Sequence, residues 1–128
     1  METTAKSKTI LIIDDEKDLR DAMSMALGYE GFATILAADG KEGLTRALVE
    51  KPDLIFLDIL MPVMDGIEML KLLRKDPWGK TVPVIVMTAI DSMDKIAEVI
   101  EQGGNEYLPK SRTTLGTIVQ KAKGRLGA

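Results

Sequence analysis

The stretch Pro52–Gly66, which reads P-D-L-I-F-L-D-I-L-M-P-V-M-D-G, decides the fold of this chain. The apolar residues 54–57 are enough for a strand buried on both faces and too few for a buried helix. Asp58 follows them directly, at the carboxyl end of the predicted strand, where an open α/β sheet has its ligand crevice. We therefore expect Asp58 to be presented at that crevice and not to be buried. The proline and glycine that follow predict a turn, and Asp65 is placed to cap the next helix.

Three other predicted strands also end in polar groups. In chain order these groups are Asp14, Asp15 and Glu16 after residues 8–13, Thr88 and the backbone N–H of Ala89 after residues 82–87, and Lys110 shortly after residues 105–108. A single strand-end carboxylate more often caps a helix or forms a turn than carries chemistry. Polar groups from four strand ends favour a common site, because the carboxyl ends of parallel strands lie at one edge of the sheet.

A fifth strand is predicted at residues 32–37, and apolar residues at helical spacing separate the strands. Five strands that alternate with five helices imply a parallel sheet with right-handed crossovers and helices on both faces. The fourth helix is predicted at residues 92–102, with Asp91 as its cap, and the fifth begins at Thr113. The expected apolar side of the fourth helix consists of Met93, Ile96, Ala97 and Ile100. Four methionines are expected to fill the core, namely Met23, Met69, Met87 and Met93.

The composition excludes several kinds of chemistry. The chain has 128 residues, with no cysteine and no histidine, which removes disulfides, thiol nucleophiles, imidazole bases and thiolate or imidazole metal sites. A metal must then be bound by oxygen ligands, as Mg²⁺ prefers. The 17 basic and 20 acidic residues give a net charge of −3, which does not indicate a nucleic-acid partner. No apolar run approaches membrane-spanning length, so we expect a soluble cytoplasmic domain.

Four motifs resemble those of the receiver domain of two-component response regulators. They are D-I-L-M-P-V-M-D-G from Asp58, I-L-I-I-D-D-E at residues 10–16, V-I-V-M-T-A at residues 84–89 and Y-L-P-K at residues 107–110. The resemblance covers nearly the whole chain. It implies a flavodoxin-like (CheY-like) doubly wound sheet of five parallel strands, in the order 2-1-3-4-5, with five helices. Residues 1–7 are then a flexible N-terminal segment, and residues 8–128 form a receiver domain without an output domain.

The resemblance also implies the chemistry of the site. Asp58 is expected to be the phosphoacceptor, which takes a phosphoryl group from a phosphohistidine on a sensor histidine kinase or a phosphotransfer protein. Mg²⁺ is expected to bind Asp15 and Asp58 directly, Asp14 mainly through water, and the backbone carbonyl of Leu60. The chain would be no enzyme beyond its own phosphorylation and dephosphorylation.

The remaining phosphoryl oxygens are expected to be bound by Lys110, by the Thr88 hydroxyl and by the backbone N–H of Ala89. By resemblance, Thr88 and Tyr107 form the switch that changes the surface of the fourth helix, the fifth strand and the fifth helix. That surface would bind a downstream protein target, and a phosphorylation-dependent homodimer is a further possibility. No membrane contact is expected.

Some positions depart from the family pattern. Ser111 follows Lys110 where receivers usually have proline, so the bond between Leu108 and Pro109 is left as either cis or trans. Leu60 and Ile90 are apolar at positions that influence hydrolysis, which predicts a comparatively long-lived aspartyl phosphate. The five basic residues of segment 110–128 either complement the carbonyl end of the last helix or form a patch for an acidic partner.

Three alternatives to a phosphorylated receiver share part of this pattern. A haloacid-dehalogenase-like phosphatase would have a second acid two residues after the nucleophile, where this chain has Leu60. A flavodoxin-like cofactor binder would need a phosphate loop where this chain has acidic residues 14–16. A receiver-like module that accepts no phosphate is disfavoured by the complete acidic set.

Overall fold

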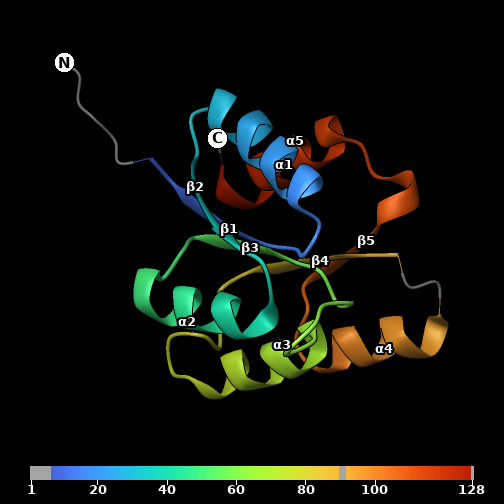
Figure 1. Cartoon of the computed structure of the whole chain (residues 1–128). Helices are drawn as coiled ribbons and strands as arrows, with labels where there is room; N and C mark the ends of the chain where they lie inside the picture. Colours follow the sequence, from blue (N-terminus) through green and yellow to red (C-terminus); the bar gives the residue numbers. More distant parts are fainter. Residues whose placement is uncertain (1–6, 90–91, 128) are drawn as a thin grey trace.

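The computed structural model describes residues 7–89 and 92–127, and its strands and helices alternate along the chain (Figure 1). In chain order the elements are β1 (Thr9–Ile13), α1 (Lys17–Tyr29), β2 (Ala33–Ala37), α2 (Gly40–Glu50), β3 (Leu54–Leu57), α3 (Gly66–Lys75), β4 (Val84–Thr88), α4 (Met93–Glu101), β5 (Glu106–Pro109), the short 3₁₀ helix η1 (Lys110–Arg112) and α5 (Leu115–Leu126). Among these described residues, no helix combines the length and the hydropathy that a membrane crossing needs.

The five strands form one parallel sheet in the order β2-β1-β3-β4-β5. This confirms the predicted fold class and strand order. The register pairs Ile13 of β1 with Leu57 of β3, so the acids that follow the two strands leave the sheet side by side. On the other side of β3, at the same carboxyl end of the sheet, Thr88 of β4 pairs with Pro109 of β5, which places Lys110 next to the end of β4.

Helices cover both faces of the sheet, with α1 and α5 on one side and α2, α3 and α4 on the other (Figure 1). Successive strand residues point to opposite faces, so Ile10 and Ile12 pack with the first pair of helices while Leu11 and Ile13 pack with the other three. Three predicted core methionines, Met23, Met69 and Met87, are buried as expected. The two cores fix the sheet and therefore the positions of its strand ends.

The prediction for α4 is partly wrong. Met93 is 79% exposed and Ile100 is 51% exposed, whereas Val99 is buried and Ile96 is half-buried. The apolar spacing correctly indicated a helix, but it did not show which part of the wide apolar stripe the sheet covers. The Ser92 side chain caps this helix by accepting from the backbone N–H of residue 95, and the predicted cap Asp91 lies outside the described residues.

Arg74 joins the end of α3 to the turns that precede β4 and β5, at the opposite end of the strands from the acids. Its guanidinium donates to the backbone carbonyls of Gly79 and Val82, both at 2.7 Å, and to that of Gly103 at 2.6 Å. It also donates to the side chain of Asn105 at 3.1 Å. Burial lowers the pKa of Arg74, and the four oxygen acceptors compensate the charge without a carboxylate.

We expect Arg74→Met to lower the free energy of unfolding by about 2 kcal/mol, because the carbonyls would lose their donor in a half-buried position. Urea denaturation of wild type and variant measures the difference. Arg46→Met is the matched control, since Arg46 forms an exposed ion pair with Glu50 at 3.6 Å, and should cost less than about 0.5 kcal/mol. Equal losses in the two variants would contradict a structural role for Arg74.

Candidate functional site

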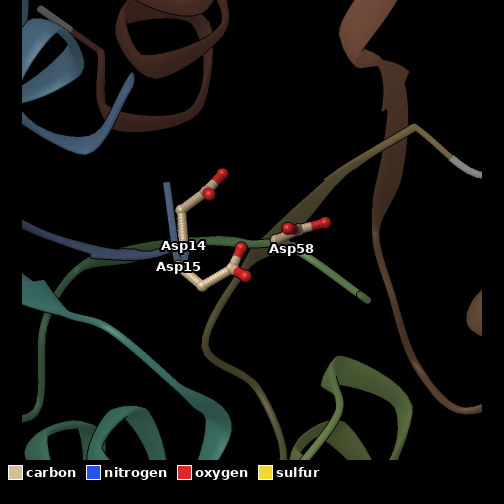
Figure 2. Close-up of side chains that lie close together, drawn as sticks. All are labelled: Asp14, Asp15 and Asp58. Atoms are coloured by element: carbon tan, nitrogen blue, oxygen red, sulfur yellow. The ribbon is translucent and has the colours of Figure 1, made fainter. Parts of the chain in front are cut away.

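The carboxylates of Asp14, Asp15 and Asp58 come together at the carboxyl ends of β1 and β3 (Figure 2). Each residue offers an oxygen within 4.8 Å of those of the other two. The backbone N–H of Asp58 donates to the carbonyl of Ile13 at 2.9 Å, which extends the β1–β3 ladder up to the cluster. The structure therefore brings together the three acids that the sequence predicted to meet.

Asp58 is buried, contrary to the expectation from the sequence. Its exposure is only 3%, equal to that of Asp14, whereas Asp15 is exposed. One Asp58 oxygen accepts from the backbone N–H of Leu60 at 3.3 Å, and the other accepts from Lys110 at 3.1 Å. The strand does end before Asp58, but the following loop and Lys110, the residue after β5, cover the carboxylate.

Lys110 is the cation of this cluster. Its ammonium group lies 2.6 Å from a Glu16 oxygen, 2.9 Å from Asp14 and 3.1 Å from Asp58. Burial by itself would lower the pKa of Lys110, but its bonds to Glu16 and Asp14 and the charge of Asp58 outweigh burial and raise that pKa above its usual value. Lys110 is therefore a permanent positive charge, with a side chain that is only 14% exposed.

The pKa of Asp58 is raised above its usual value, chiefly because burial disfavours the ionised form. Lys110 opposes this change, Asp14 adds to it through like-charge repulsion, and the N–H of Leu60 opposes it. A divalent cation among the carboxylates would relieve both the burial cost and the repulsion. The donor set consists of carboxylate oxygens alone, and so fits a hard cation such as Mg²⁺.

Thr88 and Tyr107 border a cavity of about 180 Å³ beside the cluster. Thr88 ends β4 and is 2% exposed, and Tyr107 is half-buried. The cavity is also lined by Ala89, Ile96 and Ser111. The two predicted switch residues thus face one hollow between β4, α4 and the start of η1.

The connection after β5 contains no cis peptide bond, like the rest of the described chain, so the bond between Leu108 and Pro109 is trans. Lys110 reaches Asp58 in this arrangement although Ser111 stands where receivers usually have proline. The side chain of Leu60 is 54% exposed, and Ile90 lies outside the described residues. The carbonyl of Leu60 as a metal ligand stays a prediction.

The basic residues of segment 110–128 are mostly paired within the domain. Lys121 and Arg125 form ion pairs with Glu106 of β5, and Lys123 pairs with Glu30 at the end of α1. These contacts join α5 to β5 and to the end of α1. The sequence had suggested only a charge complement to the carbonyl end of the last helix or a patch for an acidic partner. The ion pairs also leave little unpaired positive charge for an acidic partner.

Sequence reasoning missed the ion pair between Glu16 and Lys110. It named Glu16 only as the third acid after β1. The signal was present, since Glu16 and Lys110 follow strands whose carboxyl ends lie at the same edge of the sheet and carry opposite charges. Their separation of 94 positions along the chain hides the contact.

A buried aspartate, a cluster of carboxylates that could hold a hard cation and a lysine lie together at one edge of this parallel α/β sheet. This arrangement is suited to phosphoryl transfer to the aspartate. The family profile of the response regulator receiver domain matches residues 10–122, so the chain belongs to this family. Receiver domains are signalling domains that accept a phosphoryl group on an aspartate and bind Mg²⁺ at an acidic pocket. Histidine kinases or phosphotransfer proteins phosphorylate them.

Curated relatives include the response regulator MprA of Mycobacterium bovis (strain BCG / Pasteur 1173P2), which is 36% identical over 104 residues. The match covers 81% of this chain and 44% of that protein. MprA of Mycolicibacterium vanbaalenii is also 36% identical, over 101 residues that cover 79% of this chain and 43% of the relative. The chain thus spans less than half the length of these relatives.

Solved structures give the same assignment. A CheY-like receiver domain protein from Methanospirillum hungatei has a TM-score of 0.88 at 28% identity, over 95% of both chains. The chemotaxis protein CheY4 of Vibrio cholerae has a TM-score of 0.86 at 29% identity, over 93% of this chain and 98% of the other. The family match favours the receiver interpretation over a phosphatase or a flavin-binding domain.

Proposed function

We propose that Asp58 is the phosphoacceptor of this receiver domain. The observation that carries the proposal is the position of Asp58 beside the acids that follow β1 and 3.1 Å from the ammonium group of Lys110. An Asp58 oxygen attacks phosphorus, the bond from phosphorus to the donor's histidine nitrogen breaks, and the leaving imidazole takes up a proton. The product is an aspartyl phosphate.

Asp14, Asp15 and Asp58 are proposed to hold Mg²⁺, together with the backbone carbonyl of Leu60. When bound, the cation neutralises negative charge on the acids and on a phosphoryl oxygen. The three carboxylates support this role because their oxygens lie within 4.8 Å of one another.

Lys110 is proposed to bind a second phosphoryl oxygen, since its ammonium group already contacts the carboxylate that would carry the phosphoryl group. The Thr88 hydroxyl and the backbone N–H of Ala89 are proposed to donate to the third. Thr88 ends β4, Ala89 follows it, and both residues border the cavity beside the cluster.

The switch is proposed to run through Thr88 and Tyr107. Movement of Thr88 toward the phosphoryl group would let Tyr107 turn inward, and the cavity of about 180 Å³ that both residues line provides room. The surface of α4, β5 and α5 would then change its affinity for a protein target. The exposed apolar side chains of Met93 and Ile100 on α4 support binding there.

The proposal assigns residues 8–128 to the receiver domain and residues 1–7 to the segment before it, and places the domain in the cytoplasm with its phosphodonor. A phosphohistidine on a sensor kinase or a phosphotransfer protein is the donor. Control of a separate protein target and a phosphorylation-dependent homodimer stay predictions.

Intact-mass measurement of the wild-type chain with acetyl phosphate and Mg²⁺ tests the proposal. We expect the mass to increase by one phosphoryl group, and treatment with hydroxylamine to release that group as phosphate and leave an aspartyl hydroxamate in its place, as it does with acyl phosphates. Chelation of Mg²⁺ should prevent the increase, because the acidic cluster would then repel the donor. No increase with either acetyl phosphate or a phosphohistidine donor would contradict the proposal, and sustained turnover of phosphate esters would favour the phosphatase alternative.

A further inference from the structure

The Glu16 carboxylate does not have the local role that its place in the chain suggests. Glu16 is the N-cap residue of α1, yet its side chain makes no capping hydrogen bond. Its backbone N–H donates to Asp14 at 2.9 Å, while its carboxylate reaches Lys110 at 2.6 Å. The side chain therefore points toward the lysine at the end of β5 and leaves the first turn of its own helix uncapped.

Lys110 is shared between two kinds of carboxylate. Asp14 and Asp58 are buried members of the cluster suited to a metal, whereas Glu16 is 62% exposed and does not belong to that cluster. A cation bound by the buried acids would repel the ammonium group, which lies within 3.1 Å of both. Glu16 offers Lys110 an acidic partner outside the cluster.

We propose that Glu16 is a positioning residue that acts on two ligands through its ion pair with Lys110. It strengthens the binding of Mg²⁺ and weakens the binding of the phosphoryl group. This inference rests on the proposed function of Asp58. Without a metal, Lys110 contacts Glu16, Asp14 and Asp58 together. When Mg²⁺ binds, Glu16 keeps Lys110 as a partner outside the cluster, so that Asp14 and Asp58 can turn to the metal. After phosphorylation, Lys110 must leave Glu16 to bind a phosphoryl oxygen, and the loss of that ion pair weakens retention of the phosphoryl group.

Removal of the Glu16 charge should therefore have opposite effects on the two ligands. Without Glu16, Lys110 relies on Asp14 and Asp58 and competes more strongly with Mg²⁺. Lys110 also has no ion pair with Glu16 to break when it binds a phosphoryl oxygen, so the phosphoryl group should be bound more tightly.

Titration calorimetry of Glu16→Gln with Mg²⁺, and then with the phosphoryl mimic trifluoroberyllate at saturating Mg²⁺, tests the inference. We expect Mg²⁺ to bind about two- to fivefold more weakly and trifluoroberyllate to bind more tightly by a similar factor, the size that a partly exposed ion pair supports. Asp18→Asn is the matched control, because it removes the same charge two positions further on, from an exposed residue that makes no ion pair with Lys110.

The outcomes separate this inference from the proposed function. Unchanged affinities in Glu16→Gln, changes of the same sign for both ligands, or equal changes in Asp18→Asn would overturn the role of Glu16 while leaving Asp58 as phosphoacceptor. A wild-type chain that binds neither Mg²⁺ nor trifluoroberyllate would instead overturn the proposed function. A circular dichroism spectrum and an unfolding temperature for each variant check that it is folded.

Discussion

Asp58→Asn is expected to abolish phosphoryl incorporation from acetyl phosphate in the presence of Mg²⁺. An amide lacks the nucleophilic, negatively charged oxygen that attacks phosphorus, and it removes one carboxylate from the proposed metal cluster. Intact mass measured over the time in which the wild type is fully modified shows the loss. If the variant were still modified, the phosphoacceptor would be a residue other than Asp58.

Asp53→Asn is the control for this variant. Asp53 precedes the same strand at its opposite end, where its side chain accepts from the backbone N–H of Thr9 at 2.8 Å. It is exposed and lies at the amino ends of β1 and β3, whereas the acidic cluster and Lys110 lie at the carboxyl ends of the strands. We expect it to be phosphorylated as fast as the wild type.

The Asp58→Asn variant should remain folded. Because the pKa of Asp58 in the folded state is raised, its contribution to stability is present below the ordinary pKa of a carboxyl group and is lost as the pH rises through the folded-state value. At neutral pH the fold therefore bears a cost for the ionised group, which a neutral amide avoids. We expect an unfolding temperature no lower than that of the wild type at pH 7, so loss of phosphorylation reports on chemistry.

Gly66→Ala is expected to lower the free energy of unfolding by about 3 kcal/mol, near the upper end of the usual cost of overpacking. A Cβ on Gly66 would lie 2.3 Å from the carbonyl oxygen of Asp58 and 2.8 Å from the Cα of Ile59. Both are backbone atoms, which cannot move aside as the end of a flexible side chain can. The N–H of Gly66 also donates to the carbonyl of Ile59 at 2.9 Å, so α3 begins directly against the end of β3.

Chemical denaturation measures this effect, with Gly124→Ala as the matched control. Gly124 lies inside α5, and a Cβ there would meet no atom within 4 Å. Alanine favours the helical conformation, so this variant should be more stable than the wild type by about 0.5–1 kcal/mol. A Gly66→Ala protein as stable as the wild type would show that the loop between β3 and α3 can move away from Asp58.

The sequence alone determined the order of the elements and the edge of the sheet at which the chemistry lies. Apolar runs of four to six residues that end in polar groups indicated strands, and helical spacing between them indicated crossovers. Parallel strands have their carboxyl ends at one edge, and the resemblance to receivers made the first and third strands neighbours, so Asp14, Asp15 and Asp58 were expected to meet. The resemblance to receivers supplied the roles of these residues, which spacing does not contain.

Only the tertiary structure decided how deeply each group is buried and which partner it has. Asp58 is covered by a loop and by a lysine 52 positions away, and Glu16 pairs with that lysine across 94 positions. The apolar stripe of α4 is covered only in part because burial depends on how the helix is turned against the sheet. Local patterns record which residues prefer to be buried or charged, whereas burial and ion pairing arise from segments that meet only after folding.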